Sequence, residues 1–95
     1  MREKGRYRSR LRIMVDILSV IAQEGGSARP TRILYGANLS HDRLVRYLSE
    51  MEARGLIRAV QEEEHVRYEL TEKGLRLLRE IKKVEEFLRA FGLEI

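Results

Sequence analysis

The stretch that decides the fold is residues 30–54, with the sequence PTRILYGANLSHDRLVRYLSEMEAR. Pro30 suits the first turn of a helix, where its missing N–H costs no hydrogen bond. Asn38 can end that helix in the left-handed backbone region, and Ser40 can cap the start of the next helix. The stretch therefore predicts two helices joined by a short turn that is capped on both sides, which is a helix-turn-helix.

The second helix of this motif is expected to run from His41 to Arg54 and to stop at Gly55. Three- and four-residue spacing predicts a buried stripe of Leu44, Val45, Leu48 and Met51. At about 100° per residue, a second face lies more than a quarter turn from that stripe. This outer face is predicted to carry Arg43, Arg46, Tyr47, Glu50 and Arg54.

One helix is expected before the motif. Ser9 can cap it, and it runs to about Glu24, where Gly25 and Gly26 stop it. The residues predicted to face the core from this helix are Leu11, Met14, Ile17, Leu18 and Ile21.

After Gly55 the apolar spacing shifts toward two residues, which favours β-strands. Residues 56–60 and 66–70 are predicted to form a hairpin around Gln61–His65, and Thr71 is predicted to cap a last helix. The predicted fold is mainly α with a small β-hairpin, in the order helix, helix, helix, strand, strand, helix. That order is typical of a winged helix-turn-helix.

The chain has 95 residues, no cysteine and a formal net charge of +4. This length suits one domain, and the lack of cysteine excludes a disulfide framework and a thiolate metal site. No apolar run approaches membrane-spanning length and no signal peptide is recognisable, so a soluble, cytoplasmic protein is expected. We predict a flexible basic arm over residues 1–8, a winged-helix domain over residues 9–74 and a dimerisation helix over residues 75–95.

The outer face of the second motif helix is the first candidate site. A helix fits the major groove of DNA, where arginine can donate two hydrogen bonds to guanine. The residues predicted to contact duplex DNA there are Ser40, His41, Arg43, Arg46 and Tyr47. The alternative is that the arginines are solvated surface. We expect Glu50 to pair with Arg46 or Arg54 rather than to accept a hydrogen bond from cytosine.

The N-terminal arm is the second candidate, because residues 1–12 carry a net charge of +5. Its basic side chains, including Arg6, Arg8 and Arg10, are predicted to lie in the minor groove or along phosphates. Arg10 and Arg12 would lie at the positive end of the helix dipole, an unfavourable position that an external anion would offset. The alternative is a solubilising tail.

The tip of the predicted hairpin is acidic, since Glu62, Glu63 and Glu64 follow one another. Phosphate would repel this tip, so Arg58 and Arg67 on the strands are better candidates for contact with DNA, and Arg67 belongs to the predicted binding set. The alternative is a solvated turn without a role.

The last helix carries a coiled-coil pattern with alternating steps of four and three residues. This seam consists of Leu77, Ile81, Val84, Leu88 and Phe91. Leu75 and Leu78 point to another side and are expected to join the domain core. A helix with two apolar faces predicts a homodimer, and the alternative is that the helix folds back over its own domain.

Catalysis finds little support in the sequence. His41 and His65 are the only histidines, and no glycine-rich phosphate loop is present. Adjacent side chains on a helix point in different directions, so His41 and Asp42 do not suggest a metal site. We expect no enzyme activity, no cofactor, no metal and no small-molecule ligand.

Four segments resemble the small archaeal winged-helix DNA-binding proteins: residues 7–11 (YRSRL), 31–40 (TRILYGANLS), 55–57 (GLI) and 68–74 (YELTEKG). The resemblance implies a recognition helix from His41 and an antiparallel coiled-coil dimer through residues 75–91. Members of this group act as chromatin-associated proteins or transcriptional regulators. Two features depart from the group, namely the acidic hairpin tip and a terminal helix that is short for a long coiled coil.

The residues and the resemblance together predict a dimeric protein that binds duplex DNA and regulates transcription in the cytoplasm, associated with the nucleoid. Two alternatives stay open. The protein could coat DNA as a chromatin-type component, or it could be a protein-interaction winged helix that does not bind DNA.

Overall fold

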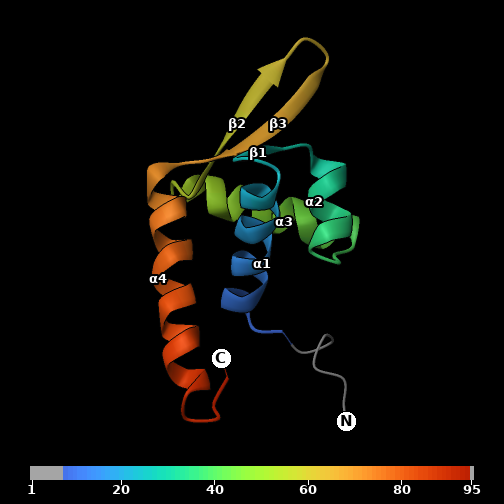
Figure 1. Cartoon of the computed structure of the whole chain (residues 1–95). Helices are drawn as coiled ribbons and strands as arrows, with labels where there is room; N and C mark the ends of the chain where they lie inside the picture. The colour runs from blue at the N-terminus through green and yellow to red at the C-terminus, as the bar shows by residue number, and fades with distance from the viewer. Residues whose placement is uncertain (1–7, 95) are drawn as a thin grey trace.

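The computed structural model describes residues 8–94, which form four helices and a three-stranded sheet (Figure 1). The elements in chain order are α1 (Arg10–Gln23), β1 (Ser27–Ala28), α2 (Pro30–Gly36), α3 (His41–Ala53), β2 (Ile57–Glu62), β3 (His65–Leu70) and α4 (Glu72–Arg89). The β2–β3 hairpin projects from one end of the molecule, and α4 runs toward the other end beside α1. The predicted winged-helix order of helices and hairpin is confirmed.

Helix α1 lies at the centre of the core. The Ser9 hydroxyl accepts a hydrogen bond from the Arg12 N–H at 3.0 Å and caps the helix, as predicted. Ile13, Ile17 and Ile21 are fully buried between the other elements. The prediction for Leu11 was wrong, because its side chain is 40% exposed. It lies near the start of α1, where α3 and α4 leave a groove between them.

The helix-turn-helix forms as predicted. Asn38 adopts a φ of +57° at the turn between α2 and α3, in the left-handed region that asparagine tolerates. The Ser40 hydroxyl accepts a hydrogen bond from the Arg43 N–H at 3.3 Å and caps α3. Leu44, Leu48 and Met51 are buried, which confirms most of the predicted stripe.

Val45 is the exception in that stripe, because its side chain is 48% exposed. The buried arc of α3 continues from Leu44 toward Tyr47, which packs against the core, and not toward Val45. Helix α1 lies on that flank, where Arg10 contacts Glu50. The buried side of α3 is therefore rotated toward Tyr47 relative to the face expected from the sequence.

The sheet has the order β1-β3-β2 and is antiparallel throughout. Strand β1 was not predicted; its Ser27 and Ala28 pair with Glu69 and Tyr68 of β3. The hairpin strands are longer than expected and enclose a tighter turn, in which Glu63 has a φ of +52°. The acidic residues thus lie at the very tip of the wing.

Helix α4 begins at the predicted cap, where the Thr71 hydroxyl accepts a hydrogen bond from the Gly74 N–H at 3.0 Å. Leu78 is buried, which confirms that this side of the helix joins the core. After α4 the chain turns back at Gly92, which has a φ of +76°, and the Leu93 N–H donates to the Leu88 carbonyl. Within residues 8–94, no helix is long and apolar enough to cross a lipid bilayer.

Candidate nucleic-acid interface

The burial of its side chains shows which face of α3 points outward. Asp42, Val45, Arg46 and Ser49 are exposed, whereas Arg43 is half-buried near the capped start of the helix. Tyr47 and Glu50 lie on the flank that faces α1 and are half-buried. Of the residues predicted from the sequence, Ser40, His41 and Arg46 are thus fully on the surface, Arg43 is partly so, and Tyr47 is largely part of the core. Sequence reasoning missed Val45 and Ser49 because it placed the buried arc on the wrong flank.

The arginines of α3 differ from those at the start of α1 and on the hairpin strands, because among the described residues they have no side-chain partner. Within residues 8–94, neither Arg43 nor Arg46 makes an ion pair or a side-chain hydrogen bond. Arg54, further along the same helix, donates to Glu50 at 3.0 Å. Glu50 was predicted to pair with Arg46 or Arg54, and it pairs with Arg54. The guanidinium groups of Arg43 and Arg46 are left free to bind an anion or a base edge.

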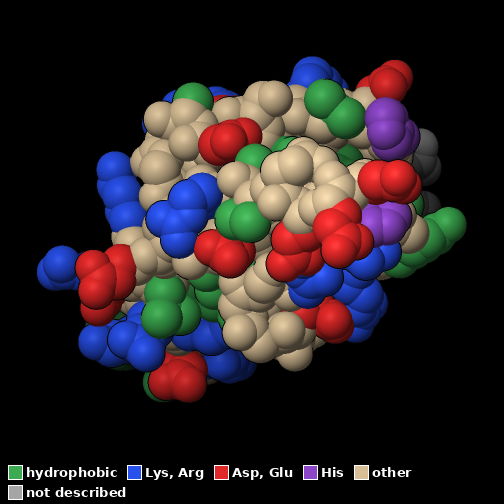
Figure 2. Space-filling view, turned by 90° about the horizontal axis from the view of Figure 1, so that it is seen from above, with side chains coloured by type: hydrophobic (Ala, Val, Ile, Leu, Met, Phe, Trp, Pro, Cys, Tyr) green, Lys and Arg blue, Asp and Glu red, His purple; other side chains and the backbone are tan. Residues whose placement is uncertain are grey.

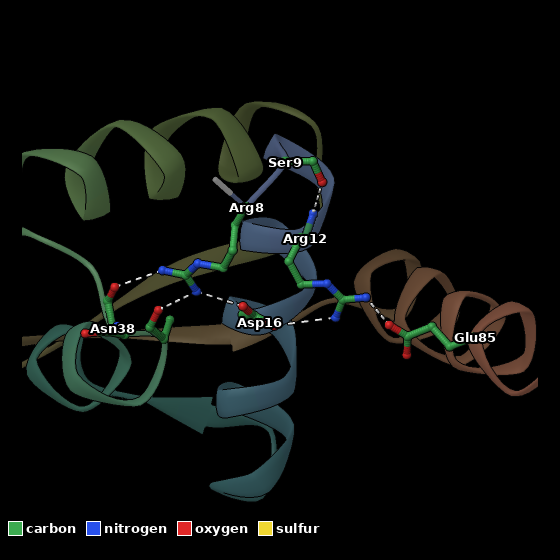
Figure 3. Close-up of polar contacts among 7 residues, drawn as sticks. Arg8, Ser9, Arg12, Asp16, Asn38 and Glu85 are labelled. Atoms are coloured by element: carbon green, nitrogen blue, oxygen red, sulfur yellow. Dashed lines mark hydrogen bonds and ion pairs between the residues drawn. The ribbon is translucent and has the colours of Figure 1, made fainter. Parts of the chain in front are cut away.

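Arg8 lies where the arm was expected, yet its guanidinium binds the protein itself (Figure 3). It donates to Asp16 Oδ2 at 2.7 Å, to the Ala37 carbonyl at 2.8 Å and to the Asn38 carbonyl at 2.8 Å. Its side chain is only 15% exposed. Arg8 therefore ties the start of α1 to the turn of the helix-turn-helix, and its donors are not free for phosphate.

Arg10 and Arg12 also find partners within the chain. Arg10 donates to Glu50, and this hydrogen bond raises the pKa of Arg10 and lowers the pKa of Glu50. Arg12 donates to Glu85 of α4, which raises the pKa of Arg12, and it also lies 3.6 Å from Asp16 (Figure 3). The expected external anion is thus not needed, because carboxylates of the protein offset the helix dipole. Arg6 lies outside the described residues.

A scan against protein-family models matches residues 7–89 to a family described as winged helix-turn-helix. The chain belongs to this family. The match covers most of the chain, including the capped motif and α4, so the whole fold and not only the motif supports the assignment.

Solved structures of other winged helices are similar. Sso10a-2, a DNA-binding protein from Sulfolobus solfataricus, is 30% identical with a TM-score of 0.73, and the match covers 90% of each chain. A MarR family protein from Bacillus stearothermophilus is 26% identical with a TM-score of 0.72, over 93% of this chain and 62% of that one. F93 from STIV, a winged-helix DNA-binding protein, is 18% identical with a TM-score of 0.71, over 82% of this chain and 90% of that one. These matches confirm the resemblance to small archaeal winged-helix proteins. A search of curated proteins found no match.

The wing of this winged helix is acidic on the surface that it presents outward. Figure 2 looks down on the wing and shows several acidic side chains near the middle of this face, with lysine and arginine side chains beside them and around the margins. The strand arginines are engaged, since Arg58 donates to Glu69 at 3.1 Å. Arg67 donates to the Ser27 hydroxyl at 2.9 Å and to the Ser27 carbonyl at 3.0 Å. Arg67 thus holds β1 on the sheet. Its guanidinium group is already engaged within the protein.

The predicted dimer seam divides into two parts. Leu77 and Ile81 pack against the core of their own domain. Toward the end of α4, Val84 and Phe91 are exposed, and Leu88 is half-buried. Sequence reasoning missed Phe87, which is 64% exposed and stacks edge-on against Phe91 with ring centroids 5.2 Å apart. Its spacing of three from Val84 and four from Phe91 was the signal for it.

Proposed function

We propose that this winged helix binds duplex DNA through α3, and that it acts as a homodimeric transcriptional regulator rather than as an enzyme. The observation that carries the proposal is the pair of unpartnered arginines, Arg43 and Arg46, near the capped start of the second helix of the motif. A helix of this kind fits the major groove, and arginine reads guanine there through two hydrogen bonds. That Sso10a-2 is a DNA-binding protein supports the same function.

The outward face of α3 suits base readout as well as phosphate binding. Val45 is an apolar group on the surface and could contact a thymine methyl group, while Ser49 can donate or accept a hydrogen bond. The acidic wing tip adds no attraction for phosphate. Contact with DNA is therefore concentrated on α3, with residues 1–7 as a further source of positive charge.

A homodimer accounts for the exposed apolar side chains near the end of α4. Val84, Phe87, Phe91 and Leu93 are all among the exposed large hydrophobic residues. Contiguous apolar surface of this kind marks an interaction site in a small protein. Two copies joined there would present two α3 helices to one duplex, as dimeric helix-turn-helix proteins do.

The direct test measures the binding of a labelled duplex by fluorescence anisotropy at several salt concentrations. Val45→Glu places a negative charge in the outward face of α3, and Gln61→Glu places the same charge at the wing tip. We expect Val45→Glu to abolish measurable binding and Gln61→Glu to leave it nearly unchanged, since phosphate repels charge only where it comes close. If the unaltered protein does not bind duplex DNA even at low salt, the proposal fails, and a protein-interaction role becomes the better explanation.

Selection of bound sites from a random duplex pool separates regulation from coating of DNA. A regulator is expected to enrich a defined motif, because each mismatched base pair costs about 1–3 kcal/mol. Equal recovery of all sequences would show that the protein covers DNA without reading it.

A further inference from the structure

A groove opens between α1, α3 and the first turns of α4, with a volume of about 610 Å³. Sites for small molecules commonly have roughly 300–1,000 Å³ and an apolar lining with a few charged or polar groups. The floor of this groove is apolar and consists of Leu11, Met14, Leu56 and Leu77. Leu11 is 40% exposed, so part of the floor remains in contact with water. Burial of such surface is favourable, and the groove is therefore suited to an occupant with an apolar body.

The wall formed by α1 and α3 carries charged groups that already bind one another. Glu50 accepts hydrogen bonds from Arg10 and from Arg54, the latter at 3.0 Å. All three side chains line the groove. An incoming anion would have to compete with Glu50 for these guanidinium groups, so this wall is the weaker of the two for binding an anion.

The wall formed by α4 carries cations that have no partner. Lys73 and Arg76 line the groove, and neither makes an ion pair or a side-chain hydrogen bond within residues 8–94. Residues three apart on a helix are neighbours on its surface, so both cations can reach one anion. Glu80 lines the same wall, but its carboxylate lies 3.2 Å from Lys83, which offsets its charge. The α4 wall therefore favours an occupant with one negative group.

We propose that the groove binds a small amphipathic anion, whose apolar body lies on the floor and whose single carboxylate accepts hydrogen bonds from Lys73 and Arg76. Arginine can donate two parallel hydrogen bonds to a carboxylate, and lysine adds a compact charge beside it. The floor can accommodate aromatic as well as aliphatic groups, since methionine adapts its shape to its neighbours. The inference goes beyond the proposed function, because these residues are distinct from those on the outward face of α3.

No small-molecule ligand was expected from the sequence. The groove brings together residues 10–14, 50–56 and 73–80, which are far apart along the chain. Each segment alone has the mixture of apolar and charged residues that is ordinary at a helix surface. The packing of α1, α3 and α4 is what places four apolar side chains beside two unpaired cations.

The groove also borders the helix that carries the proposed DNA contacts, because α3 contributes Glu50 and its C-terminal cap Arg54 to the lining. A ligand changes DNA affinity only as far as it binds the free and the DNA-bound protein differently. Binding of the anion is therefore measured without DNA, so that failure of this site and failure of the proposed function are distinguishable.

The probe is 2-naphthoate, which joins an apolar ring system to one carboxylate. Two related probes separate its contributions, since 2-naphthamide keeps the rings without the charge and acetate keeps the charge without the rings. Titration of the full chain is followed by the methyl signals of its NMR spectrum. We expect 2-naphthoate to bind saturably, 2-naphthamide to bind at least about tenfold more weakly, and acetate to show no saturation. The signals expected to shift are those of Leu11, Met14, Leu56 and Leu77.

Two double variants test whether the unpaired cations hold the carboxylate. Lys73→Gln/Arg76→Gln removes both cations, and the fold should be retained because neither side chain has a partner to lose. We expect it to weaken 2-naphthoate binding at least about tenfold and to leave 2-naphthamide binding unchanged. Arg79→Gln/Lys82→Gln removes the same charge from exposed positions of α4 outside the groove lining, and it should leave both affinities unchanged. Equal losses in the two variants would mean that net charge, and not the groove, attracts the anion, and would overturn the inference.

Leu11→Asp tests the floor, since it places a negative charge at an exposed position of the groove. We expect it to abolish binding of 2-naphthoate and to weaken binding of 2-naphthamide, with the fold retained by circular dichroism. Absence of saturable 2-naphthoate binding by the unaltered chain, or methyl shifts confined to other residues, would overturn the inference. Equal affinity for the amide would do the same, because the groove would then be a purely apolar surface. Conversion of a dimer to a monomer by 2-naphthoate in sedimentation would show that a second copy of the chain occupies the groove, and the inference would fail.

Discussion

The arginines at the start of α1 and those at the start of α3 are similar in sequence and different in structure. Arg8, Arg10 and Arg12 each bind carboxylates of the same chain. Arg43 and Arg46 bind none within residues 8–94. Both groups lie near the beginning of a helix and both were predicted to contribute to DNA binding, yet only the second group is free to do so.

The difference shows that the density of basic residues along the sequence is a poor measure of how many basic side chains remain without a partner in the folded protein. Residues 1–12 have the densest positive charge in the sequence, but part of it already serves the fold. Arg8 would have to give up three hydrogen bonds to reach a phosphate. Arg43 and Arg46 would give up only bound water on reaching DNA, so we expect each of them to add more to the affinity than Arg8 does.

Among the substitutions that remove arginines, loss of the free pair should have the largest effect on DNA binding. We expect Arg43→Ala/Arg46→Ala to weaken duplex affinity by about 2–3 kcal/mol, or roughly 30- to 150-fold, since a good arginine contact is worth about 1–3 kcal/mol. The free energy of unfolding should change by less than about 0.5 kcal/mol, because neither side chain has a partner to lose. Anisotropy titration and urea denaturation measure the two quantities.

The matched control is Arg79→Ala/Lys82→Ala, which removes the same charge from the exposed surface of α4. It should reduce affinity far less at the same salt concentration. Equal losses in the two double variants would mean that overall charge, and not the face of α3, determines binding.

Arg8→Ala should show the opposite pattern. It removes three hydrogen bonds to the turn and to Asp16, so we expect the free energy of unfolding to fall by about 1.5–3 kcal/mol. Arg8→Lys should recover only part of this loss, because an ammonium group cannot reproduce the planar fork of donors. Duplex affinity of the folded protein should change less than in the α3 double variant; a loss as large, with stability retained, would place Arg8 on DNA instead.

The sequence predicts those parts of the fold that depend on local interactions. The caps at Ser9, Ser40 and Thr71 and the left-handed Asn38 were all predicted, because each depends on residues within a few positions. Strand β1 was not predicted, because its two residues are too few to show the alternation of apolar and polar side chains that indicates a strand. It exists because β3 pairs with it and Arg67 binds Ser27 from 40 positions away.

The candidate site was harder to predict because it depends on tertiary contacts. The motif helix was located correctly, but its rotation depends on the rest of the core, against which Tyr47 packs while Val45 stays exposed. Likewise, nothing near Arg12 in the sequence indicates Glu85, which lies 73 positions away. Which arginines are free is therefore decided by the fold as a whole.

Deletion of residues 1–7 tests whether the basic residues before α1 bind DNA as well as those of α3. It removes basic residues of the arm and keeps Arg8. The deletion takes away Arg2, Lys4 and Arg6. If they bind phosphates, the slope of log affinity against log salt should fall by nearly one for each phosphate that the shortened chain no longer neutralises. Gel-shift titrations at several salt concentrations measure this slope, and a slope equal to that of the full chain would remove the arm from the interface.

The smallest effect is expected at Glu50, where an arginine of α1 and one from the end of α3 meet. Arg10 and Arg54 both donate to this carboxylate, and these hydrogen bonds lower its pKa from the ordinary value of 4.5. A lowered pKa in the folded state contributes stability that is present above the ordinary carboxyl pKa and is lost as the pH falls through the lowered value.

Glu50→Gln should therefore unfold at lower urea concentration than the unaltered protein near neutral pH, and the difference should shrink to nothing in acid. The loss should be smaller than that of Arg8→Ala, because Glu50 and both of its partners lie near the surface and water screens their charges. Denaturation series at neutral and acidic pH measure the difference. If it persisted unchanged in acid, the carboxylate charge would not be its source, and the link between α1 and α3 would depend on packing alone.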